Sequence, residues 1–149
     1  MRAVVQRVKS ASVSVEGERV SSIGPGLLIL LGISQDDGDE DIRYMVEKTL
    51  NLRIFDDEHG VMNLSLLEAG GEVLLVSQFT LYGDTRKGRR PSYNRAASPD
   101  EARIVFKEVE DAYRAQGIAL SLGVFQTETA VELINDGPVT ILVDSEKKF

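Results

Sequence analysis

The stretch Gly71–Asp84, GEVLLVSQFTLYGD, decides how the rest of the chain is interpreted. It runs as an apolar strand from Val73 to Val76 and then turns polar. This pattern is typical of a strand that carries side chains to the rim of a pocket. A second short segment, Asn135–Thr140 with the sequence NDGPVT, is expected to meet it. Most of the remaining chain is interpreted as scaffold around these two segments.

The composition narrows the class of protein. With 149 residues the chain is most simply one domain, large enough to bury a core without disulfides or metals. It has no cysteine and one histidine, so a thiol nucleophile is excluded and neither a metal site nor a cofactor is expected. That histidine, His59, follows acidic residues in a predicted turn, and we expect it to be exposed and non-catalytic. No apolar run is long enough to span a bilayer, which favours a cytoplasmic protein that does not contact membranes.

The formal net charge of −7 is unevenly distributed. Residues 82–95 contain five basic side chains against one acidic side chain, a local charge of +4, so the rest of the chain carries −11. A basic loop on an acidic body favours local contact with a compact anion over sliding along a duplex. The alternative is a solvated loop whose arginines pair with nearby acids. The cations at the centre of this loop are Arg86, Lys87, Arg89 and Arg90.

Apolar spacing predicts an α+β fold. Strands are expected at 2–8, 11–15, 19–23, 27–33, 52–55 and 61–64, within 71–84, and at 118–125, 131–134 and 139–143. One amphipathic helix begins in the acidic residues 36–41, and a second follows the capping box Ser98-x-x-Glu101 and stops at Gly117. This order predicts a single domain with a curved, largely antiparallel and barrel-like β-sheet against which two α-helices pack.

Three polar residues at the end of the opening strand, Ser77, Gln78 and Thr80, are the candidates for catalysis. On a strand, Gln78 and Thr80 point to one face, whereas Ser77 and Phe79 point to the other. A glutamine amide offers a donor and an acceptor, and threonine offers one hydroxyl. No base is adjacent in the sequence, so a Ser/Thr–His–Asp arrangement is not expected. The alternative is an edge strand whose polar side chains are satisfied by its neighbours.

Gly137 and Pro138 lie between two predicted strands. Because proline has no N–H, this dipeptide must lie where the strand ladder is interrupted. A trans bend is the common outcome, whereas a cis bond turns two successive carbonyls toward the same side. The residues alone predict no more than an anion-attracting loop beside the polar end of a strand.

Several segments occur together in a specific order. They are Met1–Val8 (MRAVVQRV), Asn51–Phe55 (NLRIF), Ser77–Tyr82 (SQFTLY), Thr85–Ser92 (TRKGRRPS) and Asn135–Thr140 (NDGPVT). This set resembles the D-aminoacyl-tRNA deacylases, and the resemblance covers essentially the whole chain, residues 1–149.

The resemblance implies an editing enzyme that hydrolyses the ester between a D-amino acid and the 3′ end of tRNA. It implies a homodimer in which a Gly-cisPro pair, by position Gly137-Pro138, reaches into the partner's site. This pair would hold the substrate's α-amino group and exclude L side chains, so that glycyl-tRNA would also be cleaved. The segment Ser77–Thr80, which includes Phe79, would line the pocket for the terminal adenosine, with Phe125 stacking near it. Hydrolysis would rely on the 2′-hydroxyl of the tRNA, and the basic loop would meet tRNA phosphates.

One segment departs from the family pattern. Where the family has Gly-Ala-Asp-Met or a close variant, this chain has Gln126–Thr129, QTET. If that methionine packs on the adenosine, Thr129 offers less apolar surface and weakens binding by roughly 1–2 kcal/mol. Two alternatives stay open: a non-catalytic module that binds the tRNA 3′ end, and an esterase with Thr80 as its nucleophile.

Overall fold

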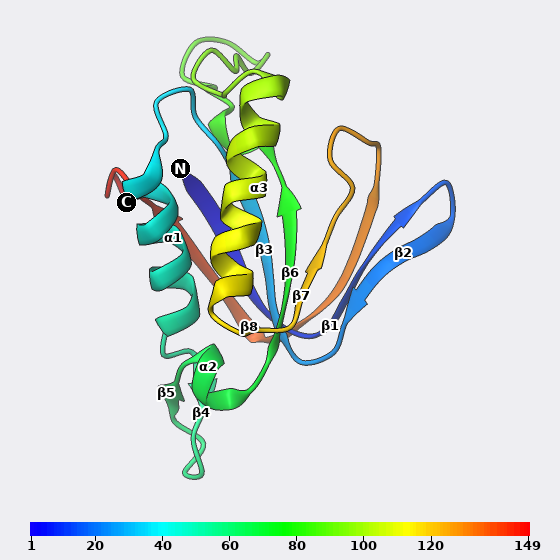
Figure 1. The fold of residues 1–149 in the computed structure, drawn as a ribbon, viewed down its shortest axis with the longest axis vertical. Coiled ribbons are helices and arrows are strands. Elements are labelled where there is room, and N and C mark those ends of the chain that lie inside the picture. Colours follow the sequence, from blue (N-terminus) through cyan, green and yellow to red (C-terminus); the bar gives the residue numbers. More distant parts are fainter.

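The computed structural model describes residues 1–149, in which a curved sheet carries helices on one side (Figure 1). The strands are β1 (Arg2–Val15), β2 (Glu18–Ile23), β3 (Gly26–Gly32), β4 (Phe55–Asp56), β5 (Met62–Leu64), β6 (Glu72–Ser77), β7 (Leu120–Leu122) and β8 (Ala130–Asp144). The helices are α1 (Asp39–Asn51), α2 (Leu66–Ala69) and α3 (Pro99–Ala115), and a 3-10 turn, η1, covers Phe79–Tyr82. None of the helices combines the length and the apolar character needed to cross a membrane.

Strand β1 organises the sheet. Its first half pairs antiparallel with β3, its second half forms a hairpin with β2, and β8 runs antiparallel along both halves. Beyond β3, strands β6 and β7 continue the sheet in parallel. The predicted α+β class with a curved, barrel-like sheet is confirmed. The sheet is mixed, because β1 makes the antiparallel pairings and β3, β6 and β7 make the parallel ones.

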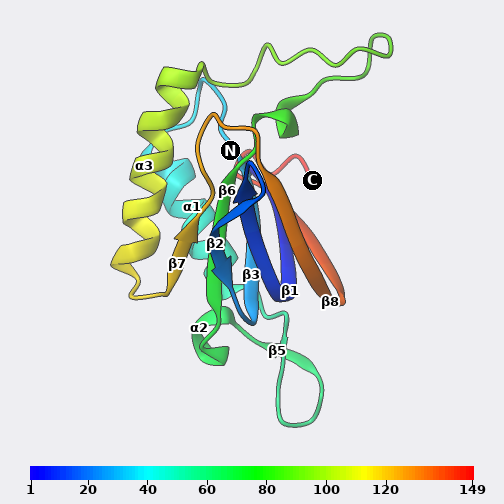
Figure 2. The same cartoon turned by 90° about the vertical axis from the view of Figure 1, so that its right-hand side faces the viewer.

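Two apolar clusters fill the two sides of the sheet. The larger lies under helices α1 and α3, which cover one face (Figure 2). Within it the hydroxyls of Thr49 and Tyr113, one from each helix, lie 2.6 Å apart, and burial raises the pKa of Tyr113. The smaller cluster lies on the opposite side, between the second half of β1, β2, β3 and β6. The bend of β1 over this second cluster gives the sheet its barrel-like curvature.

Helix starts follow the local sequence. The Glu101 N–H donates to Ser98 Oγ, and the Ser98 N–H donates to the Glu101 carboxylate at 3.1 Å, which confirms the predicted capping box. Helix α2 was not predicted, although it begins with the same reciprocal pattern between Ser65 and Glu68. A capping box can therefore be recognised even before a helix of one turn.

The prediction that the strand continues through Thr80 is wrong. Strand β6 ends at Ser77, and η1 follows. The turn packs directly on Gly32 at the end of β3, where an added Cβ would come within 3.0 Å of both Gln78 O and Leu81 Cβ. Because glycine leaves this space open, the chain can fold back over β3 instead of extending.

Other strand predictions are wrong in extent, and those at 2–8 and 11–15 form one strand, β1. The strands predicted at 131–134 and 139–143 form one strand, β8, and the strand predicted at 118–125 is reduced to β7. The strand predicted at 52–55 begins only at its last residue, as β4, which pairs with β5 across the turn that contains His59. In β8 a bulge absorbs the proline without dividing the strand.

Candidate active site

The Ser77–Tyr82 segment lies where β6 ends. The Gln78 N–H donates to Leu31 O at 2.7 Å, as the last rung of the ladder with β3. The chain then turns, and the Leu81 N–H donates to Gln78 O at 3.2 Å. Arg2, at the start of β1, donates through Nη1 to Leu81 O at 3.2 Å. The turn is therefore fixed by backbone bonds to β3 and by a side chain from β1.

This turn brings Gln78 and Thr80 together through a helical turn and not, as predicted, through strand alternation. Gln78 Nε2 donates to Thr80 Oγ1, and Phe79 between them is 55% exposed. No histidine, lysine or carboxylate bonds to Thr80 Oγ1, and the His59 side chain is 78% exposed in the β4–β5 turn. The exposure predicted for His59 is confirmed. The turn offers an amide and hydroxyls for positioning a substrate, and no protein base beside Thr80.

Gly137-Pro138 forms the tip of a bulge in β8. Residues 135–140 of β8 lie opposite only residues 6–8 of β1. The Gly137-Pro138 peptide bond is cis, and both residues are exposed. The ladder is thus interrupted at the proline, as its missing N–H predicted.

Two side chains hold the bulge from within. Asn135 Oδ1 accepts the Val139 N–H at 2.7 Å, and Asn135 Nδ2 donates to Val139 O at 3.1 Å. Arg7, which is 7% exposed, donates through Nε to Asp136 O at 2.8 Å and through Nη1 to Ile54 O at 2.6 Å. The shape of the bulge is therefore fixed by partly buried bonds to its main chain.

Arg7 is a candidate that the sequence interpretation missed. Along β1, Ala3, Val5 and Arg7 alternate toward the same side, so that an arginine occupies a core position. A buried arginine must find hydrogen-bond acceptors, and this interruption of the apolar pattern was the available signal. A Cβ at Gly137 would lie 3.3 Å from Arg7 Nη2, which shows how closely the guanidinium packs against the bulge.

The two halves of the predicted site lie toward opposite ends of the first half of β1. Arg2 contacts the turn at Leu81, whereas Arg7 contacts the bulge at Asp136. Five residues of extended chain span ~16 Å. In Figure 1 the arrowhead of β6 likewise lies toward the opposite end of the molecule from the part of β8 that crosses near the bottom. A single chain does not bring Gly137 to Thr80.

The basic loop, residues 85–91, extends away from the body (Figure 2). A backbone bridge closes its base, with Asp84 N–H to Ser92 O at 2.8 Å and Ser92 N–H to Asp84 O at 3.1 Å. Arg86 lies 2.6 Å from the Asp84 carboxylate and holds the pKa of that carboxyl well below its usual range. The alternative interpretation, in which loop arginines pair with nearby acids, therefore holds for Arg86. The cations farther along the loop are exposed and form no ion pair: Lys87, Arg89 and Arg90.

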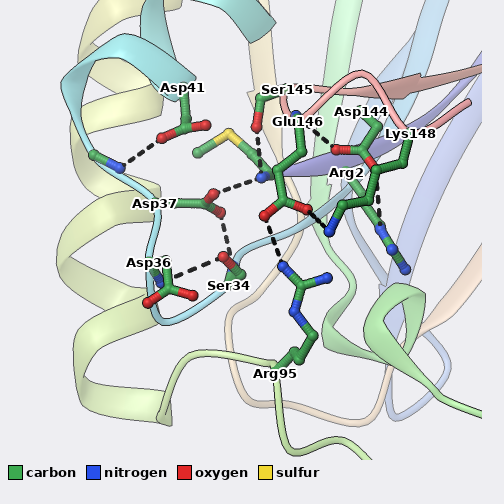
Figure 3. A network of polar contacts seen from close by, with 12 residues as sticks. Arg2, Ser34, Asp36, Asp37, Asp41, Arg95, Asp144, Ser145, Glu146 and Lys148 are labelled. Carbon is green, nitrogen blue, oxygen red and sulfur yellow. Dashed lines mark hydrogen bonds and ion pairs between the residues drawn. The ribbon is translucent and has the colours of Figure 1, made fainter.

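A polar network ties the two chain ends to the root of this loop (Figure 3). The buried Met1 ammonium lies 2.5 Å from Asp37 Oδ1. Glu146 binds Lys148 at 2.6 Å and Arg95 at 2.7 Å, and these two cations lower the pKa of Glu146 to about 2. Because Arg95 follows the basic loop, its ion pair anchors the limb on which the loop returns to the body.

Phe125 and Thr129, the two remaining residues predicted to bind the substrate, lie on the segment between β7 and β8. The backbone of this segment bonds to β6 at Leu75 O, 2.9 Å away, which places the segment beside the end of β6. Phe125 packs on Phe106 of α3 with ring centres 5.8 Å apart, and the Arg103 guanidinium lies 4.8 Å from the centre of its ring. Thr129 lines a cavity of about 470 Å³ beside the β1–β2 turn. Only Phe125 is packed against the helix layer.

The sequence matches the family model described as D-Tyr-tRNA(Tyr) deacylase over residues 4–144. The chain belongs to this family. Two similar relatives are both named D-aminoacyl-tRNA deacylase. The protein from Thermosipho africanus is 57% identical over 149 residues and is matched over the full length of both chains. The protein from Symbiobacterium thermophilum is 55% identical, with 100% of this chain and 99% of that protein covered.

Solved structures share the fold. One, titled c-Myc DNA Unwinding Element Binding Protein, superposes with a TM-score of 0.92 at 40% identity and covers 97% of this chain and 98% of its own. A second, titled as a structural analysis of a probable eukaryotic D-amino acid tRNA deacylase, has a TM-score of 0.77 at 18% identity and covers 95% and 97%. The second likeness shows the fold alone.

In this member of the deacylase family, the predicted residues fall into separate places. Ser77 ends β6, Gln78 precedes the turn η1, Phe79 and Thr80 belong to the turn, and the basic loop begins beside it. Gly137 and Pro138 lie on the bulge near the other end of the first half of β1. The geometry therefore divides the predicted site into two parts that lie apart on one chain.

Proposed function

We propose that the chain, as one domain over residues 1–149, hydrolyses the ester that joins a D-amino acid to the 3′ end of tRNA. The observation that carries this proposal is the full-length identity of 55–57% with relatives named D-aminoacyl-tRNA deacylase. The products are uncharged tRNA and the free D-amino acid, and the reaction takes place in the cytoplasm without a cofactor.

In the proposed reaction, water attacks the ester carbonyl carbon, the bond from that carbon to the ribose oxygen breaks, and the ribose keeps the oxygen as a hydroxyl. Thr80 Oγ1 bonds only to Gln78, so no protein base activates this hydroxyl as a nucleophile. The terminal 2′-hydroxyl of the tRNA adjoins the ester and assists the proton transfer. Ser77, Gln78 and Thr80 then orient the ester and this hydroxyl, which is catalysis by positioning.

Selection against L-amino acids is proposed to work by exclusion at Gly137 and Pro138. A pocket that relies on apolar contact gains only ~1–3 kcal/mol per methylene, and it cannot recognise many different D side chains individually. Carbonyls on a bulge held by Arg7 and Asn135 do not move aside as a side-chain rotamer can. They accept the substrate's α-ammonium and leave no room for an L side chain. Glycine has no side chain to exclude, so glycyl-tRNA is also a substrate.

The proposed site is shared between two copies of the chain. On one chain the turn is held by Arg2 and the bulge by Arg7, and these residues lie ~16 Å apart along β1. A two-fold axis between two copies can instead bring the bulge of one copy to the turn of the other. An apolar strip on the sheet offers a surface for this contact. Leu30 and Leu142 both pair with Val4 across three strands, and Leu142 is 57% exposed.

The proposed tRNA contacts lie at the turn η1, on the segment between β7 and β8, and on the basic loop. Phe79 and Phe125 border the terminal adenosine, and Thr129 replaces the family's methionine with a smaller apolar contact. Lys87, Arg89 and Arg90 meet backbone phosphates, with Arg86 available if phosphate displaces Asp84. Exposed cations without ion pairs are available to neutralise phosphates, and the counterions that this releases from the RNA favour binding.

The test is hydrolysis of D-tyrosyl-, L-tyrosyl- and glycyl-tRNA by the purified protein. We expect the D-tyrosyl and glycyl esters to be cleaved and the L-tyrosyl ester to survive. Pro138→Ala, which frees a backbone dihedral of the bulge, should lose activity or selectivity while staying folded. Binding of tRNA without hydrolysis of any ester would favour the non-catalytic module. If D-tyrosyl-tRNA were cleaved but glycyl-tRNA were not, selection by exclusion would be refuted.

A second experiment separates tRNA-assisted catalysis from an esterase with Thr80 as nucleophile. Thr80→Ala should keep substantial activity, whereas tRNA that ends in 2′-deoxyadenosine should be hydrolysed poorly. Removal of a true nucleophile costs several orders of magnitude. Such a loss in Thr80→Ala, with normal turnover of the deoxy substrate, would establish the esterase instead.

A further inference from the structure

Two exposed aromatic rings, one in the turn η1 and one at the end of the basic loop, pack against each other. Phe79 belongs to η1, and Tyr93 lies on the limb by which the loop returns. Their ring centres are 5.1 Å apart at an interplanar angle of 68°, an edge-to-face pair. Phe79 is 55% exposed and Tyr93 is 38% exposed, so much of this aromatic surface faces solvent.

The Tyr93 ring is held in place by the main chain around it. A Cβ at Gly83 would lie 3.2 Å from Tyr93 Cε1, so the ring packs directly on the backbone there. Tyr93 O accepts the Ala96 N–H at 3.0 Å, and the bridge between Asp84 and Ser92 closes the loop one residue earlier. A ring fixed in this way loses little conformational entropy when a planar ligand stacks on it.

The surroundings of the pair indicate an RNA strand as its occupant. The cations beyond it, Lys87, Arg89 and Arg90, are exposed and have no acidic partner. Gln78 and Thr80, which flank Phe79 in the chain, add polar groups beside it. Stacking rings beside unpaired cations are what single-stranded nucleic acid requires, because its bases offer faces and its backbone offers charge.

We propose that Tyr93 stacks a base of the single-stranded tRNA 3′ end upstream of the terminal adenosine, next to Phe79, which borders the adenosine itself. This inference rests on the proposed function and extends it to the nucleotides that precede the reacting one. Tyr93 is then a substrate-binding residue that makes hydrolysis depend on the tRNA strand as well as on the aminoacyl-adenosine.

The test compares D-tyrosyl-tRNA with D-tyrosyl-adenosine, which has no upstream base, for wild type, Tyr93→Ala, Tyr93→Leu and Tyr93→Phe. The measured quantity is the ratio of kcat/KM for the tRNA to kcat/KM for the adenosine ester. Tyr93→Ala and Tyr93→Leu should lower this ratio roughly 5- to 100-fold, chiefly through KM for the tRNA. Tyr93→Phe should keep it. Tyr44→Leu, which removes a half-buried tyrosine of α1, is the matched control and should also keep it.

The inhibition constant of the trinucleotide CCA against D-tyrosyl-tRNA hydrolysis provides a second readout, which is needed if the adenosine ester is turned over too slowly. It should rise in Tyr93→Ala and Tyr93→Leu and stay unchanged in Tyr93→Phe. The stacking role is overturned if the two substrates lose the same factor in Tyr93→Ala and the trinucleotide inhibits as before. It is also overturned if Tyr93→Leu behaves like Tyr93→Phe, because apolar packing would then suffice. Failure of wild type to cleave any D-tyrosyl ester would instead refute the proposed function.

Discussion

The bulge at Gly137-Pro138 and the basic loop are both exposed, but they are built in opposite ways. In the bulge, Arg7 and Asn135 bond to main-chain groups from within, and the tip presents backbone to solvent. In the basic loop, a backbone bridge closes only the base, and the tip presents long cationic side chains with no partner. A surface of fixed backbone suits discrimination by shape, whereas mobile cations attract any polyanion.

This difference separates selectivity from affinity within one protein. A perturbation of the bulge should change which esters are cleaved and how fast. A perturbation of the loop should change how tightly tRNA is bound and how strongly salt weakens that binding. The bulge is also tied to the fold through Arg7, so its perturbation should affect stability as well.

The largest effect is expected from Arg7→Met, which keeps the length of the side chain but removes every donor. Two carbonyls, of Asp136 and Ile54, lose their partner, each at about 1–3 kcal/mol, so the free energy of unfolding should fall by roughly 2–6 kcal/mol. Deacylation should fall more than about 100-fold because the bulge loses its position. Urea unfolding and D-tyrosyl-tRNA hydrolysis measure the two effects.

Arg19→Met, at an exposed arginine of β2, is the control for Arg7→Met and should change stability by less than about 0.5 kcal/mol. If Arg7→Met were as stable and as active as this control, the bulge would not depend on the buried guanidinium.

The next effect concerns Gly137→Ala. Gly137 has φ 141°, and an added Cβ would come within 2.7 Å of Val139 Cγ2, so the bulge must deform. We expect a roughly 10- to 100-fold loss of activity or measurable cleavage of L-tyrosyl-tRNA. Gly60→Ala is a matched control, because Gly60 also has a positive φ, 73°, but its Cβ would meet nothing within 4 Å. Equal activities of the two variants would refute a role for the shape of the bulge.

The contrast between the two regions was only partly predictable from the sequence. Helix α3 and its capping box follow from neighbouring residues, so local spacing was sufficient. The turn after Ser77 depends on Gly32 in another strand, and the continuity of β8 depends on pairing with β1 on both sides of a bulge. Such non-local packing is absent from any short window of sequence. The role of Arg7 was hidden for the same reason, because its partners, Asp136 and Ile54, are distant in the chain.

A smaller effect is expected in the basic loop. Reversing the charges of Lys87, Arg89 and Arg90 should raise KM for tRNA and reduce the salt slope of binding by about 0.7 for each lost phosphate contact on single-stranded RNA. Exposed unpaired charges add little to folding, so stability should change by less than about 1 kcal/mol. Lys48→Glu on α1 makes the same charge change as Lys87→Glu away from the loop and should leave the slope unaltered. A wild-type slope in the loop variant would mean that the loop is only solvated.

The smallest effect concerns the network that anchors the root of the loop. Lys148 and Arg95 lower the pKa of Glu146 from 4.5 to about 2 in the folded protein. A carboxyl whose pKa is lower in the folded than in the unfolded protein stabilises the fold at a pH above its unfolded pKa. This contribution is lost as the pH falls from about 4.5 to 2. Glu146→Gln should therefore be slightly less stable than wild type at pH 7, and the difference should vanish toward pH 2. A difference that widened on acidification would contradict this ion pair.

The central claim, that each active site combines the turn of one copy with the bulge of the other, can be tested by mixing two inactive variants. Gly137→Val disables the bulge, and Phe79→Asp disables the turn at an exposed position. In a mixed dimer one site receives both intact halves and the other receives both damaged halves. Random re-association should therefore restore about a quarter of wild-type deacylation, because half of the dimers are mixed and each has one working site. Mixed dimers with activity no higher than that of the two variants alone would contradict the shared site.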